Sequence, residues 1–191
     1  MKTSSLLILS CITASLWTRQ QDPGFAANQL VFSLNKLGQG RSWTRIAPLF
    51  VHANPLHLFG NMLFLFVFGR TLENSVGPRK LLAVFFLAGF ATFILSIAFL
   101  PRGTGMLGAS AAIFALAGRA MLVRPLRFTW LFFAPQGVIA MVYFLYNLIV
   151  VFDESRIPGY DPQVAYISQV IGFFSESLSV LPRAIIGSVI Y

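Results

Sequence analysis

The sequence is poor in charge, and above all in acidic side chains. Only 10% of its 191 residues are charged, with 6 Asp and Glu against 14 Lys and Arg. Soluble domains carry about a quarter charged residues, so an ordinary soluble domain is excluded. The single cysteine, Cys11, can form no internal disulfide and says nothing about the redox compartment. No metal or nucleotide motif is present, and we expect no cofactor.

A basic stripe of the kind that binds nucleic acid is also missing. The net charge of +8 would suggest nucleic acid in a soluble protein, but the basic residues are scattered between apolar segments. We therefore expect the lipid bilayer, and not nucleic acid, to be the partner of this chain. Internal repeats and paired broken helices are missing as well, which argues against a transporter.

The sequence consists largely of long apolar segments without charged residues. Hydrophobic residues make up 57% of the chain, and its mean hydropathy is +0.75. Several charge-free windows reach the ~20 residues that a helix needs to cross a bilayer. Continuous runs without alternation favour helices over a barrel. We predict one all-α membrane domain, 1–191, with six spans at about 3–18, 54–71, 80–100, 108–123, 130–152 and 164–182.

The first of these segments has a second interpretation. Lys2 followed by an apolar core, with small residues at Ala14 and Ala26, also fits a cleaved signal peptide. This alternative is the weaker one because five more spans follow.

The basic residues predict an orientation. Eight lie at the N-terminus and after even-numbered spans (Lys2, Arg70, Arg79, Lys80, Arg119, Arg124, Arg127, Arg183), and six lie on the other side (Arg19, Lys36, Arg41, Arg45, Arg102, Arg156). The positive-inside rule then places both termini in the cytoplasm.

The first connection, 19–53, is long and apolar, and its Trp43 and Arg45 suit a loop that lies partly in the membrane surface.

Two polar residues interrupt the second span. His57 and Asn61 are spaced i, i+4, so a helix presents them on one face. An intramembrane Asn alone often serves only to bond a neighbouring helix. Two such residues on one face, with His52 shortly before them, favour a functional site.

Ser110 occupies a comparable position in the fourth span. Glycines at 103, 105 and 108 precede it and helix formers follow, so it lies at or near a helix N-terminus. Free backbone N–H groups and the positive end of the helix dipole favour developing negative charge there. Ser110 is either an N-cap or a nucleophile with an oxyanion hole formed by its own amide, His57 and Asn61.

In this combination the sequence resembles the rhomboid family of intramembrane serine proteases. The resemblance covers about 43–173 and rests on "WTR" (43–45), "HANPLHLFGN" (52–61), "FVFGRTLE" (66–73), "GASAAIFA" (108–115) and "VAY" before a sixth span that contains glycine. The first span agrees only in position. The resemblance implies a six-transmembrane-helix rhomboid bundle whose substrates are transmembrane proteins.

The resemblance also implies roles for individual residues. Ser110 would be the nucleophile, and His57, Asn61 and the Ser110 amide would hold the oxyanion. His52, Phe114 and Gly108 would line the site. Small residues would allow close helix packing, namely Ala111, Ala115, Gly118 and Gly172.

One position departs from the family pattern. Rhomboid proteases take their general base from a histidine in the sixth helix, three residues before a glycine. With Gly172 as that glycine, Gln169 stands at the histidine position, and Glu176 stands where the family's next glycine would be. A glutamine amide accepts no proton near neutral pH, and in serine proteases loss of the triad histidine lowers kcat about 10⁶-fold.

Two functions from different classes therefore stay open. One is an intramembrane serine endopeptidase with very low turnover. The other is a rhomboid pseudoprotease that binds transmembrane helices without cutting them.

Overall fold

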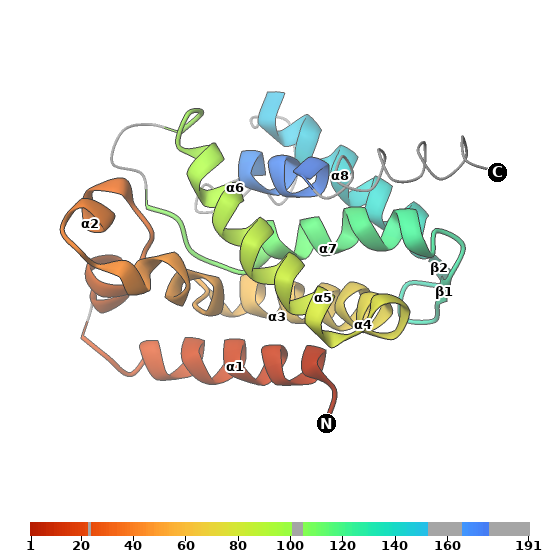
Figure 1. Ribbon diagram of the computed structural model, residues 1–191, viewed down its shortest axis with the longest axis horizontal. Helices are drawn as coiled ribbons and strands as arrows, with labels where there is room; N and C mark the ends of the chain where they lie inside the picture. Colours follow the sequence, from red (N-terminus) through yellow and green to blue (C-terminus); the bar gives the residue numbers. More distant parts are fainter. Residues whose placement is uncertain (23, 101–104, 153–165, 176–191) are drawn as a thin grey trace.

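The computed structural model describes residues 1–22, 24–100, 105–152 and 166–175, and most of them are helical. The α-helices are α1 (Thr3–Thr18), α2 (Leu34–Gly38), α3 (Pro55–Phe64), α4 (Arg70–Val76), α5 (Pro78–Ala83), α6 (Gly89–Ser96), α7 (Ser110–Val123) and α8 (Gln136–Phe152), followed by Tyr166–Ser175 (blue in Figure 1). Five short helical turns are η1 (Ala26–Leu30), η2 (Ser42–Arg45), η3 (Ala47–Phe50), η4 (Leu65–Gly69) and η5 (Val84–Ala88), and the two strands are β1 (Phe128–Thr129) and β2 (Ala134–Pro135).

Two of the described helices are long and apolar enough to cross a membrane. The π-helical turn η4 joins α3 to α4 in one helix, Pro55–Val76, and η5 joins α5 to α6 in another, Pro78–Ser96. Gly77 separates them with φ +88°, a conformation that glycine adopts without steric cost. Pro78 then opens α5, where its fixed φ suits the first helical turn.

The predicted spans compare with these helices as follows. The first coincides with α1, and the second, third and fourth correspond to Pro55–Val76, Pro78–Ser96 and α7. The fifth needs a correction at its start, because 130–135 belongs to the β1–β2 hairpin and α8 begins only at Gln136. Of the sixth, 166–175 is helical, and its remaining positions lie outside the described residues.

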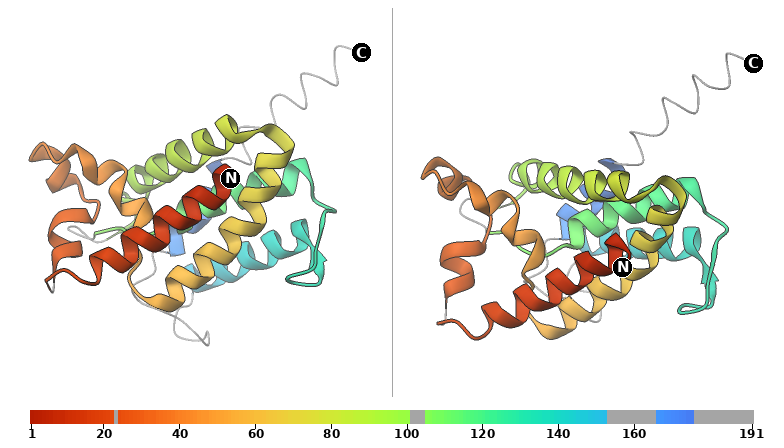
Figure 2. Two further views of the ribbon diagram at one scale, coloured as in Figure 1. Left: turned by 90° about the horizontal axis from the view of Figure 1, so that it is seen from below. Right: turned by 60° about the horizontal axis from the view of Figure 1, so that its bottom comes forward.

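Helix α7 lies in the middle of the bundle and contacts α3, α4, α6 and α8 (Figure 2). Its small residues Ala111, Ala115 and Gly118 are all buried, which lets neighbouring backbones approach closely. One such approach is at Gly172, where a Cβ would lie 2.4 Å from the Ala111 carbonyl oxygen. Only glycine fits at this contact, so Gly172 sets how the last described helix packs on α7.

Helix α1 is bound into the bundle by a buried carboxylate. Glu73 of α4 accepts hydrogen bonds from the Thr3 amide (2.8 Å), the Ser4 amide (3.1 Å) and the Ser4 hydroxyl (2.7 Å). Amides in the first turn of a helix have no partner within it, and a carboxylate there also complements the helix dipole. These bonds attach the start of α1 to α4.

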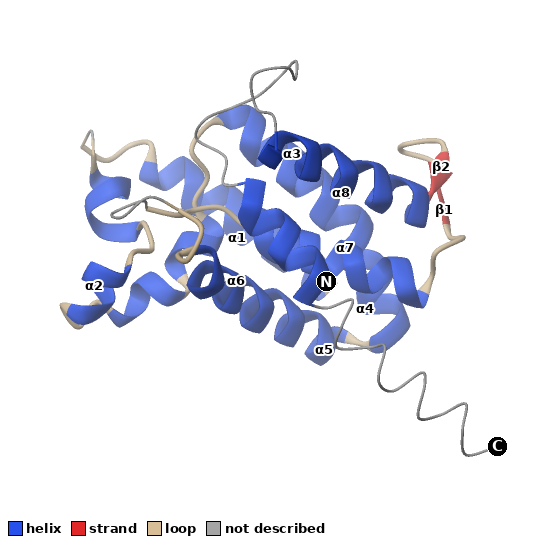
Figure 3. Cartoon of the chain, turned by 90° about the horizontal axis from the view of Figure 1, so that it is seen from above, coloured by secondary structure: helices blue, strands red, loops and turns tan. Residues whose placement is uncertain are grey.

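The two ends of the bundle carry different structures. The segment with α2 stands at one end, and the β1–β2 hairpin stands at the other (Figure 3). Residues of the first connection bond to one another, as in the 2.9 Å bond from the Trp43 indole to the Gln29 carbonyl. Phe32 and Met106 exchange two backbone hydrogen bonds (2.9 and 3.0 Å), which attach this connection to the chain that leads into α7.

The contact at Gly172 yields the first prediction. Gly172→Ala places a methyl group against the Ala111 carbonyl, and we expect the free energy of unfolding to fall by about 1–3 kcal/mol. The measurement is thermal unfolding of the purified protein in detergent. Gly60→Ala is the matched control, since a Cβ there meets nothing within 4 Å and alanine favours the helix by up to about 1 kcal/mol. Equal behaviour of the two variants would contradict the close contact.

Candidate active site

Ser110 is the first residue of α7 and is partly buried. The helix ladder begins at Ala109, whose carbonyl accepts the Ile113 amide at 2.9 Å. The Ser110 amide therefore belongs to the group of N–H donors at a helix start that have no partner inside the helix. Gly108 turns the chain into α7 with φ +107°, and a Cβ there would come within 3.1 Å of the His57 ring. Glycine thus brings the loop close to His57.

Helix α3 supplies the facing wall. Asn54 caps it by accepting the His57 amide at 2.7 Å. One turn later the Asn61 side-chain amide donates to the His57 carbonyl at 2.9 Å. An amide nitrogen carries two hydrogens, so this bond uses one of them and orients the side chain.

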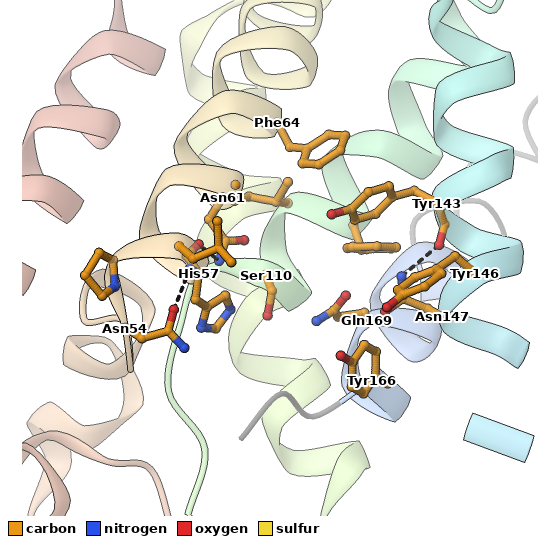
Figure 4. Close-up of a pocket in the computed structure, with 15 residues that line it drawn as sticks. Asn54, His57, Asn61, Phe64, Ser110, Tyr143, Tyr146, Asn147, Tyr166 and Gln169 are labelled. Atoms are coloured by element: carbon orange, nitrogen blue, oxygen red, sulfur yellow. Dashed lines mark hydrogen bonds between the residues drawn. The ribbon is translucent and has the colours of Figure 1, made fainter. Parts of the chain in front are cut away.

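Ser110, His57, Asn61 and Gln169 line one pocket, with a volume of about 600 Å³. In Figure 4 the Ser110 side chain lies between His57 and Asn61 on one side and Gln169 on the other. Phe114 also lines the pocket, and its ring centroid lies 5.5 Å from that of Tyr143. The structure thus brings together the residues that the sequence analysis singles out for the nucleophile, oxyanion and base positions.

His52 and Gly108 are not among the residues that line this pocket, and both lie close to the His57 ring. His52 is only 4% exposed and borders a separate cavity near the end of α1. Its ring meets the His57 ring edge-on, with 5.5 Å between centroids. That His52 and Gly108 line the site stays a prediction.

Hydrogen bonds give His52 a supporting position. Its Nε2 accepts the Ala109 amide (3.4 Å), and its Nδ1 lies 3.1 Å from the Ser15 hydroxyl, which in turn donates to the Phe50 carbonyl (3.1 Å). These contacts need a neutral ring with the proton on Nδ1. Burial, followed by the nearby His57, lowers the pKa of His52 to about 3, against an opposing bond to Phe50. His52 thus joins α1 to the residue just before Ser110.

Helix α8 and the last described helix contribute residues that the sequence analysis missed. Tyr143, Tyr146 and Asn147 of α8 line the pocket, as does Tyr166 (Figure 4). The Asn147 side-chain amide donates to the Tyr143 carbonyl at 2.7 Å, as Asn61 does to His57. The sequence contains a signal for Asn147, because a polar residue within an apolar span such as 130–152 is itself a sign of function.

Asn147 keeps one buried acceptor. The residue is 1% exposed, and its Oδ1 has no hydrogen-bond partner among the described residues. Leaving such a group unbonded is costly, so Oδ1 favours a ligand or water that donates a hydrogen bond in the pocket.

Glu176, which the sequence places at a family glycine position, lies outside the described residues. Within the described parts of the chain, no group of three or more His, Cys, Asp and Glu side chains could hold a metal ion.

Comparison with known proteins decides the family. The family model of the rhomboid domain matches residues 39–180. The chain belongs to the rhomboid family. This confirms the resemblance seen in the motifs around His57 and Ser110. Rhomboid proteins are integral membrane proteins, and the two long apolar helices fit this.

Individual rhomboid relatives agree over most of the chain. Rhomboid-like protease 2 of Toxoplasma gondii is 32% identical over 127 residues (60% of this chain, 45% of the relative). Rhomboid protease GluP of Bacillus subtilis is 31% identical over 149 residues (78% and 28%). RHOMBOID-like protein 7 of Arabidopsis thaliana is 30% identical over 136 residues (71% and 41%). This rhomboid chain thus spans less than half the length of the relatives it matches.

The position of His52 yields the second prediction. His52→Phe keeps a ring but removes the acceptor of the Ala109 amide, and we expect the free energy of unfolding to fall by about 1–3 kcal/mol. Ser15→Ala, which removes the contact on the far side of the ring and the bond to the Phe50 carbonyl but keeps the acceptor of the Ala109 amide, serves as the milder control. The measurement is thermal unfolding in detergent at several pH values.

The pH dependence follows from the lowered pKa of His52. The His52 side chain binds a proton with a pKa of 6.5 in the unfolded chain and only near 3 in the folded chain. The contribution of neutral His52 to the free energy of unfolding is therefore complete above pH 6.5 and is lost as the pH falls towards 3. We expect His52 to account for a loss of roughly 2 kcal/mol between pH 8 and pH 5. His52→Phe should lack this part of the loss, and an unchanged pH profile would contradict the buried neutral ring.

Proposed function

We propose that the protein is a rhomboid-type intramembrane serine endopeptidase with slow turnover, acting on transmembrane protein substrates. The observation that carries this proposal is Ser110 at the start of α7, in one pocket with His57 and Asn61. A serine at a helix N-terminus, faced by two side-chain donors, is the arrangement that acyl transfer requires.

In this proposal the Ser110 hydroxyl attacks a substrate carbonyl carbon. The carbonyl oxygen gains negative charge, and the Ser110 amide and the His57 ring stabilise it as donors. The Asn61 hydrogen that is not bonded to the His57 carbonyl is the third donor. The dipole of α7 acts in the same direction.

The pocket walls support an extended polypeptide as the substrate. An extended chain exposes backbone N–H groups, and the buried Asn147 Oδ1 is an acceptor for one of them. Tyr143, Tyr146 and Tyr166 offer apolar ring faces to side chains of a membrane segment, and their hydroxyls offer bonds to its backbone.

Gln169 limits the turnover in this proposal. The Ser110 proton needs an acceptor, and a glutamine amide is not one near neutral pH. His52 is no substitute, because its Nε2 already accepts the Ala109 amide. His57 is the remaining imidazole, and in this role it would have to accept the serine proton while donating to the oxyanion.

A specific observation favours the second candidate, a rhomboid pseudoprotease. The residue that faces Ser110 from the last described helix is Gln169 (Figure 4), which can bond a substrate amide or carbonyl but cannot act as a base. A protein with this site would hold a transmembrane helix without cleaving it.

We further propose the full membrane arrangement. A single domain crosses the bilayer six times, with α1, Pro55–Val76, Pro78–Ser96, α7, α8 and the helix that begins at Tyr166 as its spans. Both termini are cytoplasmic by the distribution of basic residues. The first connection lies partly in the membrane surface, supported by the exposed side chains of Leu34, Trp43 and Ile46.

The third prediction tests the base position. The assay is cleavage of a transmembrane substrate in proteoliposomes by the unmodified protein and by Gln169→His. We expect very low cleavage by the unmodified protein and an increase of about 10²- to 10⁴-fold on restoring an imidazole. Ser110→Ala in the Gln169→His background should abolish the gain.

A second variant keeps this test decisive. Glu176 could hinder helix packing, so Gln169→His with Glu176→Gly is compared in the same assay. If this variant binds the substrate and still does not cleave it, the pseudoprotease is the correct function. Robust cleavage by the unmodified protein, lost in Ser110→Ala but kept in His57→Ala, would show that the base is another group.

The fourth prediction concerns substrate entry between α3 and α8. Phe64 of α3 and Tyr143 of α8 close this side of the pocket, with ring centroids 4.1 Å apart. A substrate helix needs the two to separate. We expect a short thiol cross-link between Phe64→Cys and Tyr143→Cys, in a protein with Cys11→Ala, to abolish substrate capture, which a pull-down measures.

The control is a cross-link at an interface that need not open. A Cβ at Gly69 would lie 3.5 Å from the Ser4 Cβ, so Ser4→Cys with Gly69→Cys locks α1 against η4 at a distance that suits a disulfide. This pair should leave capture intact. Capture that persists with α3 and α8 cross-linked would exclude this entry route.

A further inference from the structure

The hairpin between α7 and α8 exposes a group of large apolar side chains. Leu126 is 83% exposed, Trp130 77% and Phe133 78%. Phe133 also has φ 50°, an unfavourable conformation for a bulky residue. Exposed apolar groups of this size on one hairpin, with Trp130 and Phe133 at its tip and Leu126 at its base, indicate contact with something other than water.

The base of the hairpin is firmly attached to the bundle. The Gly137 amide donates to the Pro125 carbonyl, and the Gln136 amide donates to the Arg127 carbonyl, both at 2.9 Å. The Arg127 guanidinium (3.0 Å) and the Gln136 side chain (2.6 Å) both donate to the Thr71 hydroxyl of α4. The apolar tip is therefore held in one position relative to α4.

A cavity of about 720 Å³ lies beside this base. Its lining brings together the end of α4, the end of α7 and the first residues of the hairpin: Asn74, Ser75, Val123, Arg124, Pro125, Leu126 and Arg127. The charged side chains in this lining are two guanidinium groups, and the other polar ones are an amide and a hydroxyl. The nearby Glu73 carboxylate is bonded to the start of α1.

We propose that this cavity binds the phosphate of an anionic phospholipid headgroup. Arg124 and Arg127 would hold the phosphate oxygens, since a guanidinium offers paired donors with the geometry of such an anion. Trp130, Phe133 and Leu126 enter the boundary between headgroups and acyl chains, where tryptophan in particular is favoured. Basic pockets at helix ends of membrane proteins bind acidic lipids through the same combination.

The position of the cavity favours a lipid over free phosphate. Arg124 and Arg127 lie within a few residues of the exposed apolar tip, so a ligand that reaches both has a charged head and an apolar body. Trp17 and Trp43, each about half exposed, mark the opposite end of the bundle. Exposed tryptophans at both ends match the two interfaces of a bilayer.

The first test measures lipid binding directly and needs no proteolysis. Native mass spectrometry of the full chain in detergent compares binding of the first phosphatidylglycerol molecule with that of phosphatidylcholine. We expect phosphatidylglycerol to be preferred, and Arg124→Gln and Arg127→Gln each to weaken its binding about fivefold. Circular dichroism checks that both variants stay folded, because Arg127 also bonds to Thr71.

The matched control removes the same charge elsewhere. Arg79 and Lys80 are exposed at the start of α5 and do not line the cavity, so Arg79→Gln with Lys80→Gln should keep the preference. An equal loss in this control would reduce the effect to net charge and overturn the proposal. Release of the lipid by millimolar inorganic phosphate, or equal binding of phosphatidylcholine, would also overturn it.

The second test locates the hairpin tip. Trp17→Phe and Trp43→Phe leave Trp130 as the only tryptophan, which is excited selectively over the tyrosines, in protein reconstituted into phosphatidylglycerol-containing vesicles. We expect lipids brominated near the headgroup to quench Trp130 more than lipids brominated near the chain end. Strong quenching by aqueous acrylamide without quenching by bromine would place the tip in water and contradict the proposal.

Discussion

The contact between Gly172 and Ala111 is the constraint on which the pocket depends. A Cβ at Gly172 would lie 2.4 Å from the Ala111 carbonyl, so the last described helix and α7 meet backbone to backbone at one register. Ala111 directly follows Ser110, and Gln169 lies three residues before Gly172, which is close to one helical turn. The contact therefore determines that Gln169, and not another face of its helix, is turned towards Ser110.

Polar groups elsewhere in the bundle show how an apolar protein holds such a register. Few polar side chains are present, and those near the site form hydrogen bonds that connect one helix to the next. Glu73 joins α4 to the start of α1, and His52 joins the later part of α1, through Ser15, to the loop before Ser110. Helix α1 is thus hydrogen-bonded both to α4 and, through His52, to the loop before Ser110. In this way α1 supports the pocket although it contributes no residue to the pocket lining.

The parts of this structure that sequence could predict are those with regular spacing. His57 and Asn61 share a helix face because they are four residues apart, and the glycine before Ser110 indicates where α7 begins. The start of α8 could not be predicted in this way, because 128–133 is as apolar as a membrane span. Arg127 and Gln136, which flank the hairpin, donate to Thr71 of α4, a long-range contact that spacing does not reveal. The edge-on contact of His52 with the His57 ring likewise arises from the fold and could not be predicted from spacing.

The site separates the two contributions on which a serine hydrolase depends. In the proposed protease, donors to the oxyanion and the walls that hold a substrate come from α3, α7 and α8, while the expected base position, Gln169, belongs to the last described helix. In serine proteases without a working triad, oxyanion stabilisation and binding still give about 10³- to 10⁴-fold catalysis over water. Under the proposed function, a chain with Gln169 keeps a pocket that binds and polarises a peptide bond but lacks an efficient acceptor for the Ser110 proton. Exchange of the Gln169 side chain for histidine leaves the backbone contact at Gly172 unchanged. The cleavage activity of this variant is therefore sufficient to distinguish a slow protease from a binding protein.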